Sequence, residues 1–167
     1  MAIANSESDT VSVFSNRGDG TFSPTSQVAT GHRPSHVSIA DLNGDGAPDL
    51  ATVNHDNNVY TDHFGSISML FNQGPGAFDA HSSYPAGDGP AGVAIGDMDG
   101  DGDLDAAVGN TDGDGVSVLL NQGDGSFAAP VAYAVGSRPW DVDIADLDGD
   151  GDLDLVLGNQ LSASVSV

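Results

Sequence analysis

A segment of 23 residues occurs three times in this chain without a gap, and this repeat constrains the fold more than any other feature. The copies are HRPSHVSIADLNGDGAPDLATVN (32–54), DGPAGVAIGDMDGDGDLDAAVGN (88–110) and SRPWDVDIADLDGDGDLDLVLGN (137–159). A glycine-rich turn ending in Phe also recurs, as NRGDGTF, NQGPGAF and NQGDGSF. Repeats of this length are typical of arrays in which each unit packs only on its neighbours.

Each repeat reads as four short antiparallel strands. VSIAD, VAIGD and VDIAD alternate apolar with small or polar residues at period two, and LATVN, AAVGN and LVLGN are more continuously apolar. VSVF, ISMLF and VSVLL lead into the glycine-rich turn, and a fourth strand follows each Phe. Four strands in about 49 residues predict an all-β, propeller-like array of blades.

The repeat divides the chain into four units. We expect a partial blade with strands two to four at 1–31, a blade at 32–87 with an insertion at 55–66, a third at 88–136, and a partial blade with strands one to three at 137–167. About three and a half blades do not close a ring, since closed propellers have four to eight. We therefore expect a longer repeat chain, or self-association through exposed blade edges.

These features together resemble the FG-GAP or VCBS repeat of integrin-alpha-type β-propellers. The shared elements are the D-x-[DN]-G-D-G-x-x-D loop after the first strand, the apolar strand and Asn that follow it, and the N-x-G-x-G-x-F turn. The resemblance extends over essentially the whole chain.

The resemblance implies three calcium sites, one in each acidic loop, with a backbone carbonyl supplied by the seventh loop position. The implied ligands are Asp41, Asn43, Asp45, Ala47 and Asp49 in the first loop, Asp97, Asp99, Asp101, Asp103 and Asp105 in the second, and Asp146, Asp148, Asp150, Asp152 and Asp154 in the third. Calcium prefers six to eight oxygen ligands, which carboxylates, amides and carbonyls supply.

Other interpretations of the loops fit less well. An EF-hand needs Glu at the twelfth position and flanking helices, whereas Thr52, Val108 and Leu157 stand there within predicted strands. Solvated acidic turns are the plain alternative, because Asp and Gly are ordinary turn residues. Magnesium is disfavoured because it gives up its waters reluctantly.

The composition restricts the partners. The chain has 25 acidic residues against three Arg and no Lys, for a formal net charge of −22. Nucleic acid and anionic membrane surfaces require basic patches and are poor partners. There is no Cys, no apolar run approaches the roughly 20 residues of a membrane span, and the first residues lack a signal-peptide pattern. An acidic, lysine-free surface also fits a saline environment.

In an up-and-down blade, successive connections between strands alternate between the two ends of the blade. We expect these two ends to differ in function. Calcium loops and glycine-rich turns share one end, and the other end carries residues suited to recognition. The candidate ligand-binding residues are His32, Arg33, Tyr60, His63, Phe64, Arg138 and Trp140. The alternative is that Trp140 packs between blades and the arginines balance nearby carboxylates. His55 and His63, eight residues apart, are interpreted as surface residues rather than a metal site.

Two further patterns are given a structural interpretation. Arg17, Gly18 and Asp19 spell the cell-adhesion tripeptide, but they occupy the glycine-rich turn that reads NQGDG in another copy. No nucleophile elbow is present, and no helix or Lys follows GDGDG as a phosphate loop requires.

We expect a non-catalytic, calcium-stabilised binding or adhesion module outside the cell, with a protein or glycan ligand. The alternatives are an architectural subunit of a surface assembly and a propeller domain of a carbohydrate-active protein.

Overall fold

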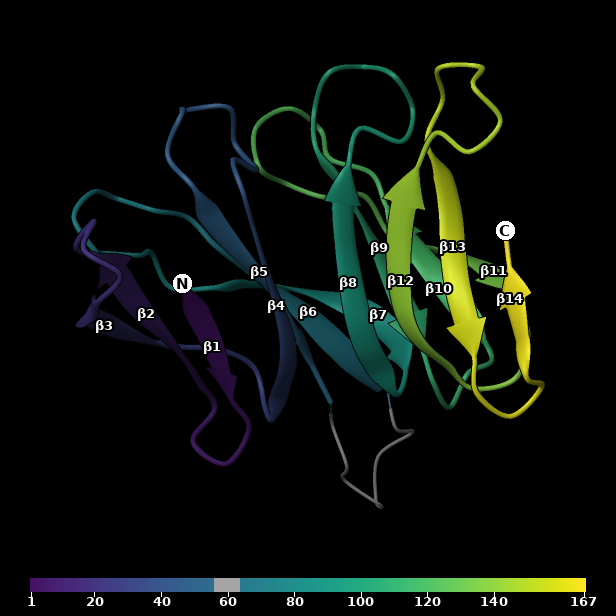
Figure 1. The fold of residues 1–167 in the computed structure, drawn as a ribbon, viewed down its shortest axis with the longest axis horizontal. Coiled ribbons are helices and arrows are strands. Elements are labelled where there is room, and N and C mark those ends of the chain that lie inside the picture. Colours follow the sequence, from purple (N-terminus) through teal and green to yellow (C-terminus); the bar gives the residue numbers. More distant parts are fainter. Residues whose placement is uncertain (56–63) are drawn as a thin grey trace.

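In the part of the chain that the structure describes, fourteen strands make four separate antiparallel sheets that follow one another along the sequence (Figure 1). The computed structural model describes residues 1–55 and 64–167. Within them every regular element is a strand, which confirms the all-β prediction. No helix in the described part of the chain is long and apolar enough to cross a membrane.

The two inner sheets have four strands and the two terminal sheets have three. The first sheet consists of β1 (Ala2–Asn5), β2 (Thr10–Asn16) and β3 (Phe22–Ala29). The second consists of β4 (Pro34–Ala40), β5 (Asp49–Asn54), β6 (Phe64–Leu70) and β7 (Ser82–Asp88). The third consists of β8 (Pro90–Gly96), β9 (Asp105–Asn110), β10 (Gly115–Leu119) and β11 (Val131–Ala134). The fourth consists of β12 (Pro139–Ala145), β13 (Asp154–Asn159) and β14 (Ser164–Ser166).

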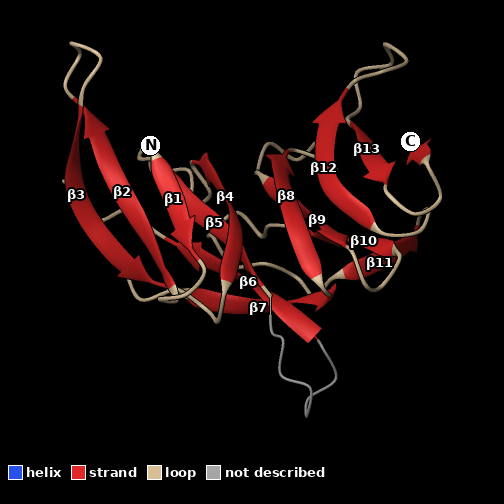
Figure 2. Ribbon diagram, turned by 60° about the horizontal axis from the view of Figure 1, so that its bottom comes forward, coloured by secondary structure: helices blue, strands red, loops and turns tan. Residues whose placement is uncertain are grey.

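In every sheet, consecutive strands are hydrogen-bonded neighbours, as in an up-and-down blade. The sheets are arranged in an arc, with β4, β8 and β12 on its concave side and β7 and β11 on its convex side (Figure 2). The arc is open between the first and fourth sheets (Figure 2). A propeller-like arrangement is therefore present without closure into a ring.

The core consists of layers between adjacent sheets, and the strand period of two produces it. In β9, Ala106 and Val108 pack toward the second sheet with Ile67 and Met69, whereas Ala107 packs toward the fourth sheet with Leu157. Both faces of β9 are thus covered, and all of its residues are buried. A strand covered on both faces has a continuously apolar sequence rather than an alternating one.

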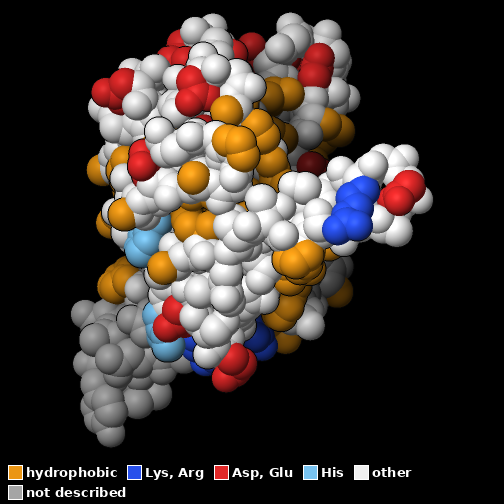
Figure 3. Space-filling model, turned by 90° about the vertical axis from the view of Figure 1, so that its left-hand side faces the viewer, with side chains coloured by type: hydrophobic (Ala, Val, Ile, Leu, Met, Phe, Trp, Pro, Cys, Tyr) orange, Lys and Arg blue, Asp and Glu red, His pale blue; other side chains and the backbone are white. Residues whose placement is uncertain are grey.

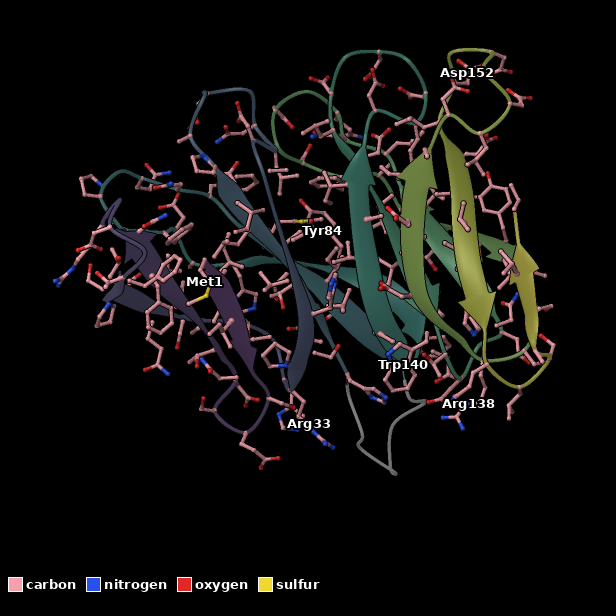
Figure 4. The ribbon with its side chains drawn as sticks, viewed as in Figure 1. Met1, Arg33, Tyr84, Arg138, Trp140 and Asp152 are labelled. Atoms are coloured by element: carbon pink, nitrogen blue, oxygen red, sulfur yellow. The ribbon has the colours of Figure 1, made fainter. Side chains whose placement is uncertain are left out.

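The first strand of each repeat begins with a Pro and an irregular register. The irregularities lie between Pro34 and His36, between Pro90 and Gly92, and between Pro139 and Val142. Such bulges bend a strand locally and turn its side chains to a new direction. All three lie at the end of the molecule opposite the acidic loops, where Figure 4 labels Arg33, Arg138 and Trp140.

Candidate metal sites and a cavity at the opposite end

The acidic loops join the first and second strands of three sheets and share one backbone conformation. In the second loop Gly100 and Gly102 have φ angles of +78° and +97°, and glycines at the same positions of the other two loops are also left-handed. This conformation favours glycine, which has no Cβ. In the second loop the N–H groups of both glycines donate to Asp97, at 2.8 and 3.0 Å, and fix its carboxylate inside the turn.

In two of these loops three carboxylates come together. Oxygens of Asp97, Asp99 and Asp105 all lie within 4.8 Å of one another in the second loop, and those of Asp146, Asp148 and Asp154 do so in the third. These are the first, third and ninth loop positions. Each group could hold a metal ion, because oxygens at this separation can contact one cation.

The first loop has the same course but a different set of contacts. Its third position is Asn43, whose amide nitrogen donates to Asp45 at 3.2 Å. Both oxygens of Asp41 accept backbone N–H groups, from Asp45 at 3.1 Å and Gly46 at 2.8 Å. Among the described residues, the groups of three acidic side chains are those of the second and third loops, so Asp41, Asp45 and Asp49 form no equivalent cluster.

The carboxylate at the fifth position has a local partner in every loop. Asp45, Asp101 and Asp150 each accept the backbone N–H of the residue two positions later, at 2.8 to 2.9 Å. Those later residues are Ala47, Asp103 and Asp152, the implied carbonyl donors. Asp99 and Asp148 accept a backbone N–H in the same way and belong to the clusters, whereas Asp101 and Asp150 are not among the three carboxylates of either cluster.

The carboxylate at the ninth position also holds the loop together. Asp105 is fully buried and accepts the N–H of Met98 and that of Asn121, both at 2.8 Å. Asp49 accepts the N–H groups of Leu42 and Asn72 in the same way. It thereby joins the acidic loop to the glycine-rich turn of its sheet. The sequence pattern marks these residues as metal ligands and gives no signal for this second role.

Burial raises the pKa of Asp49 and of Asp105, and the two backbone N–H bonds to each carboxylate oppose the rise. Nearby carboxylates add a smaller upward effect on the pKa, because they are like charges. A bound cation would offset the repulsion among these like charges.

Some of the candidate ligand-binding residues come together at the end of the molecule opposite the acidic loops. Arg138 and Trp140 line one cavity of about 420 Å³, together with residues of the second and third sheets. Figure 4 shows both at the end of the molecule away from Asp152. His55 lines the same cavity, with its Nδ1 atom buried.

The other candidates are separate from that cavity. His32 contacts the carboxylate of Asp9 at 3.1 Å, and the Arg33 N–H donates to the same carboxylate at 2.8 Å. Phe64 is exposed at the start of β6, whereas Tyr60 and His63 lie outside the described residues. In the view onto the first sheet, acidic side chains gather along the upper end, and His side chains lie in the lower half (Figure 3).

Contacts within the Arg17-Gly18-Asp19 turn agree with its structural interpretation. Asp19 accepts hydrogen bonds from the backbone N–H of Thr21 at 2.9 Å and from its hydroxyl at 2.6 Å, and the hydroxyl bond lowers the pKa of Asp19. Asp124, at the same position of the third turn, has the same pair of contacts with Ser126.

Two solved structures share this fold at low sequence identity. A lectin from Agrocybe aegerita that recognises non-reducing terminal N-acetylglucosamine is 24% identical over 90% of this chain, with a TM-score of 0.53. A chain of the Photorhabdus luminescens Tc holotoxin pore is 22% identical over 98% of this chain, with a TM-score of 0.56. This chain spans 41% of the lectin and 8% of the toxin chain. No curated protein sequence matches.

The sequence profile of the FG-GAP-like repeat matches three segments, residues 1–52, 54–108 and 97–157. The segments together include all three acidic loops and nearly the whole chain. The chain belongs to the FG-GAP-like repeat family.

Proposed function

We propose that this chain is a calcium-stabilised, non-catalytic binding module that acts outside the cell or at its surface. Three calcium ions would be held by the three acidic loops, the first most weakly. A rigid array of sheets would then present the opposite end of the molecule to a ligand.

The observation that carries the proposal is the gathering of three carboxylates in each of two loops. Like charges this close repel one another unless a cation lies among them. Among residues 1–55 and 64–167, the one charge pair within 4.0 Å joins His32 to Asp9, so no basic side chain of that region compensates either cluster. A bound metal ion would supply the missing positive charge.

Calcium fits the donor set better than other metals. Every implied ligand in the three loops offers oxygen, from a carboxylate, the Asn43 amide or a backbone carbonyl, and the chain has no Cys for a thiolate site. A bound calcium would neutralise the carboxylates and hold each loop closed. The first loop has Asn43 where the others have Asp99 and Asp148, and fewer charged ligands lower calcium affinity.

Repeat modules of this kind suit a calcium-rich surrounding, because extracellular calcium modules bind at about 10⁻⁴–10⁻³ M. The fold shared with a lectin supports recognition as the role. An architectural role in a surface assembly is the second candidate, and the open arc of sheets favours it because exposed sheet edges can pair with further strands (Figure 2).

Thermal unfolding in calcium, in chelator and in magnesium at low ionic strength tests the proposal. One site at about 100 times its Kd adds about 2.7 kcal/mol, which raises the Tm of a chain this long by about 5–10 °C. Asp99→Asn should reduce the stabilisation, whereas Asp103→Asn should retain it, because only the backbone carbonyl of residue 103 is an implied ligand. Identical unfolding curves in calcium and in chelator would show that the loops bind no calcium.

A further inference from the structure

The cavity at the end opposite the acidic loops is built from equivalent positions of three successive repeats. Ser35, Ala91 and Trp140 align in the sequence, and so do His36, Gly92 and Asp141. All of these except Gly92 line the cavity. At these two aligned positions the middle repeat has Ala91 and Gly92, whereas the last repeat has the larger Trp140 and Asp141.

The absence of a side chain at Gly92 leaves room for Asp141 in the wall of the cavity. A Cβ at this position would lie 2.5 Å from an oxygen of Asp141, closer than real contacts allow. The bulge between Pro139 and Val142 includes Trp140 and Asp141 and changes the direction of the strand there. The cavity therefore depends on residues that differ between the repeats, and not on the residues that the repeats share.

Trp140 provides an aromatic surface for a ligand. It is the single Trp of the chain and is 61% exposed, although a side chain of this size is usually well covered. An exposed ring on a rigid strand can stack on an apolar face of a ligand at little cost in conformational entropy. The volume of about 420 Å³ lies within the usual range of small-molecule sites, about 300–1,000 Å³.

The polar groups around the cavity offer both donors and acceptors. The His36 Nδ1 accepts the N–H of Val93 at 3.2 Å, so its Nε2 carries the proton and is a donor. One oxygen of Asp141 accepts the Val142 N–H, which leaves the other for a ligand. Asp112 and Arg138 are exposed at the rim of the cavity. The carboxylate of Asp112 adds a hydrogen-bond acceptor, and the guanidinium of Arg138 adds several N–H donors.

From this arrangement we propose that the cavity binds a neutral terminal pyranose ring of a glycan, stacked on Trp140. Sugar hydroxyls would donate to Asp112 and Asp141 and accept from His36 and Arg138. Two carboxylates beside one guanidinium leave a net negative charge, which disfavours an acidic sugar. A cationic ligand is the competing outcome, and choline distinguishes it in the test below. The proposal rests on the binding role proposed above and adds the ligand class and the site.

Trp140 is also the reporter for the test, because no other Trp contributes to the emission. The calcium-loaded protein is titrated with methyl glycosides of glucose, galactose, mannose and N-acetylglucosamine to tens of millimolar. We expect a saturable change in emission with at least one of them, and none with choline chloride. No change with any glycoside, or a change with choline alone, overturns the proposal.

Matched variants locate the binding. Asp141→Asn should weaken it about tenfold, as for one hydrogen bond to a charged group. Asp143→Asn should leave it unchanged, because Asp143 lies two residues along β12, has the same contact with the next N–H and is outside the cavity. Equal weakening by both variants overturns the assignment.

A second readout does not depend on Trp fluorescence. Saturation-transfer NMR of the active glycoside should lose its signal in Trp140→Ala and keep it in Tyr133→Ala, since Tyr133 is also an exposed aromatic residue, on β11, but lies outside the cavity. Loss of signal in both variants or in neither would contradict stacking on Trp140. Calcium-dependent Tm is recorded for every sample, so failure of the calcium sites is recognised separately from failure of the cavity.

Discussion

The fully buried carboxylate of Asp105 combines two tasks in one residue. It completes an acidic cluster with Asp97 and Asp99, and it accepts two backbone N–H groups, from Met98 and Asn121. A group with two backbone partners has a structural role even when no metal is bound. Stability measured in chelator can separate this role from metal binding.

Asp105→Asn should destabilise the protein by about 1–3 kcal/mol in chelator, because the amide leaves one buried N–H without an acceptor. Asp101→Asn, in the same loop but outside the cluster, should have little effect under those conditions. Urea unfolding of both variants in chelator measures the difference. Equal stability of the two would contradict the structural role of Asp105.

Asp9 has a similar local role at the other end of the molecule. The backbone N–H of Arg33 and the imidazole of His32 lower its pKa, with the backbone bond as the larger cause. Because the folded-state pKa is depressed, this stabilisation is present above the unfolded value of about 3.9 and is lost as the pH falls through the folded value.

Asp9→Asn should therefore lower the Tm at pH 6 and have a diminishing effect as the pH falls below about 4. Asparagine retains an acceptor for Arg33 and tolerates the left-handed conformation of residue 9, which has a φ of +54°. A series of thermal melts between these pH values measures the effect, with Glu7→Gln as the control. A difference in Tm that stays constant with pH would show that the charge of Asp9 is not responsible.

At the scale of the elements, the ends of different strands meet through a repeated contact between Gly and Asn. A Cβ on Gly31, after β3, would lie 2.7 Å from the Cγ of Asn54 at the end of β5. Gly87 with Asn110 and Gly136 with Asn159 show the same close approach. Each Asn donates to Ser hydroxyls on the next strand of its sheet, and this holds its side chain in place.

Gly31→Ala should destabilise the protein by about 1–3 kcal/mol, because the hydrogen-bonded Asn54 cannot move away without loss. Gly158→Ala is the control, since a Cβ there meets nothing within 4 Å. Chemical unfolding of both variants, and of the double variant with Asn54→Ala, gives the coupling between the two sites. Additive effects in the double variant would exclude the contact as the cause.

At the scale of the whole molecule, a net charge of −22 on 167 residues destabilises the folded state by self-repulsion when calcium is absent. Raising NaCl should increase the Tm clearly in chelator, because salt screens repulsion among the loops. In saturating calcium the same salt series should have a smaller effect. An equal salt dependence in both conditions would contradict calcium binding within the loops.

The open arc of sheets predicts association between molecules through exposed sheet edges. Edge strands such as β3 and β14 have one side without a neighbour in the four sheets described (Figure 1). Unpaired edges promote association with further strands. We expect the average mass from light scattering to increase with protein concentration. A monomeric mass at all concentrations would contradict association through these edges.

The repeated sequence alone predicted much of this protein. Period-two patterns identified the strands, and the D-x-[DN]-G-D-G-x-x-D loops identified Asp97, Asp99 and Asp105 as candidates for one cluster. Local geometry and chemistry suffice for both, because strand alternation and a glycine-dependent turn involve residues close in the chain.

Only the tertiary structure decided which side chains meet between elements. It brought Trp140 beside His36 and Asp112, and it placed the Asn121 N–H on Asp105. It also showed that Asp97, Asp99 and Asp105 are the carboxylates of the second loop that come within 4.8 Å of one another. The cavity depends on how neighbouring sheets pack and on the direction of bulged strands, whereas the Asp105 contact depends on how two loops of one sheet meet. A sequence pattern records which residues alternate within a strand, but it does not record which side chains from different sheets meet.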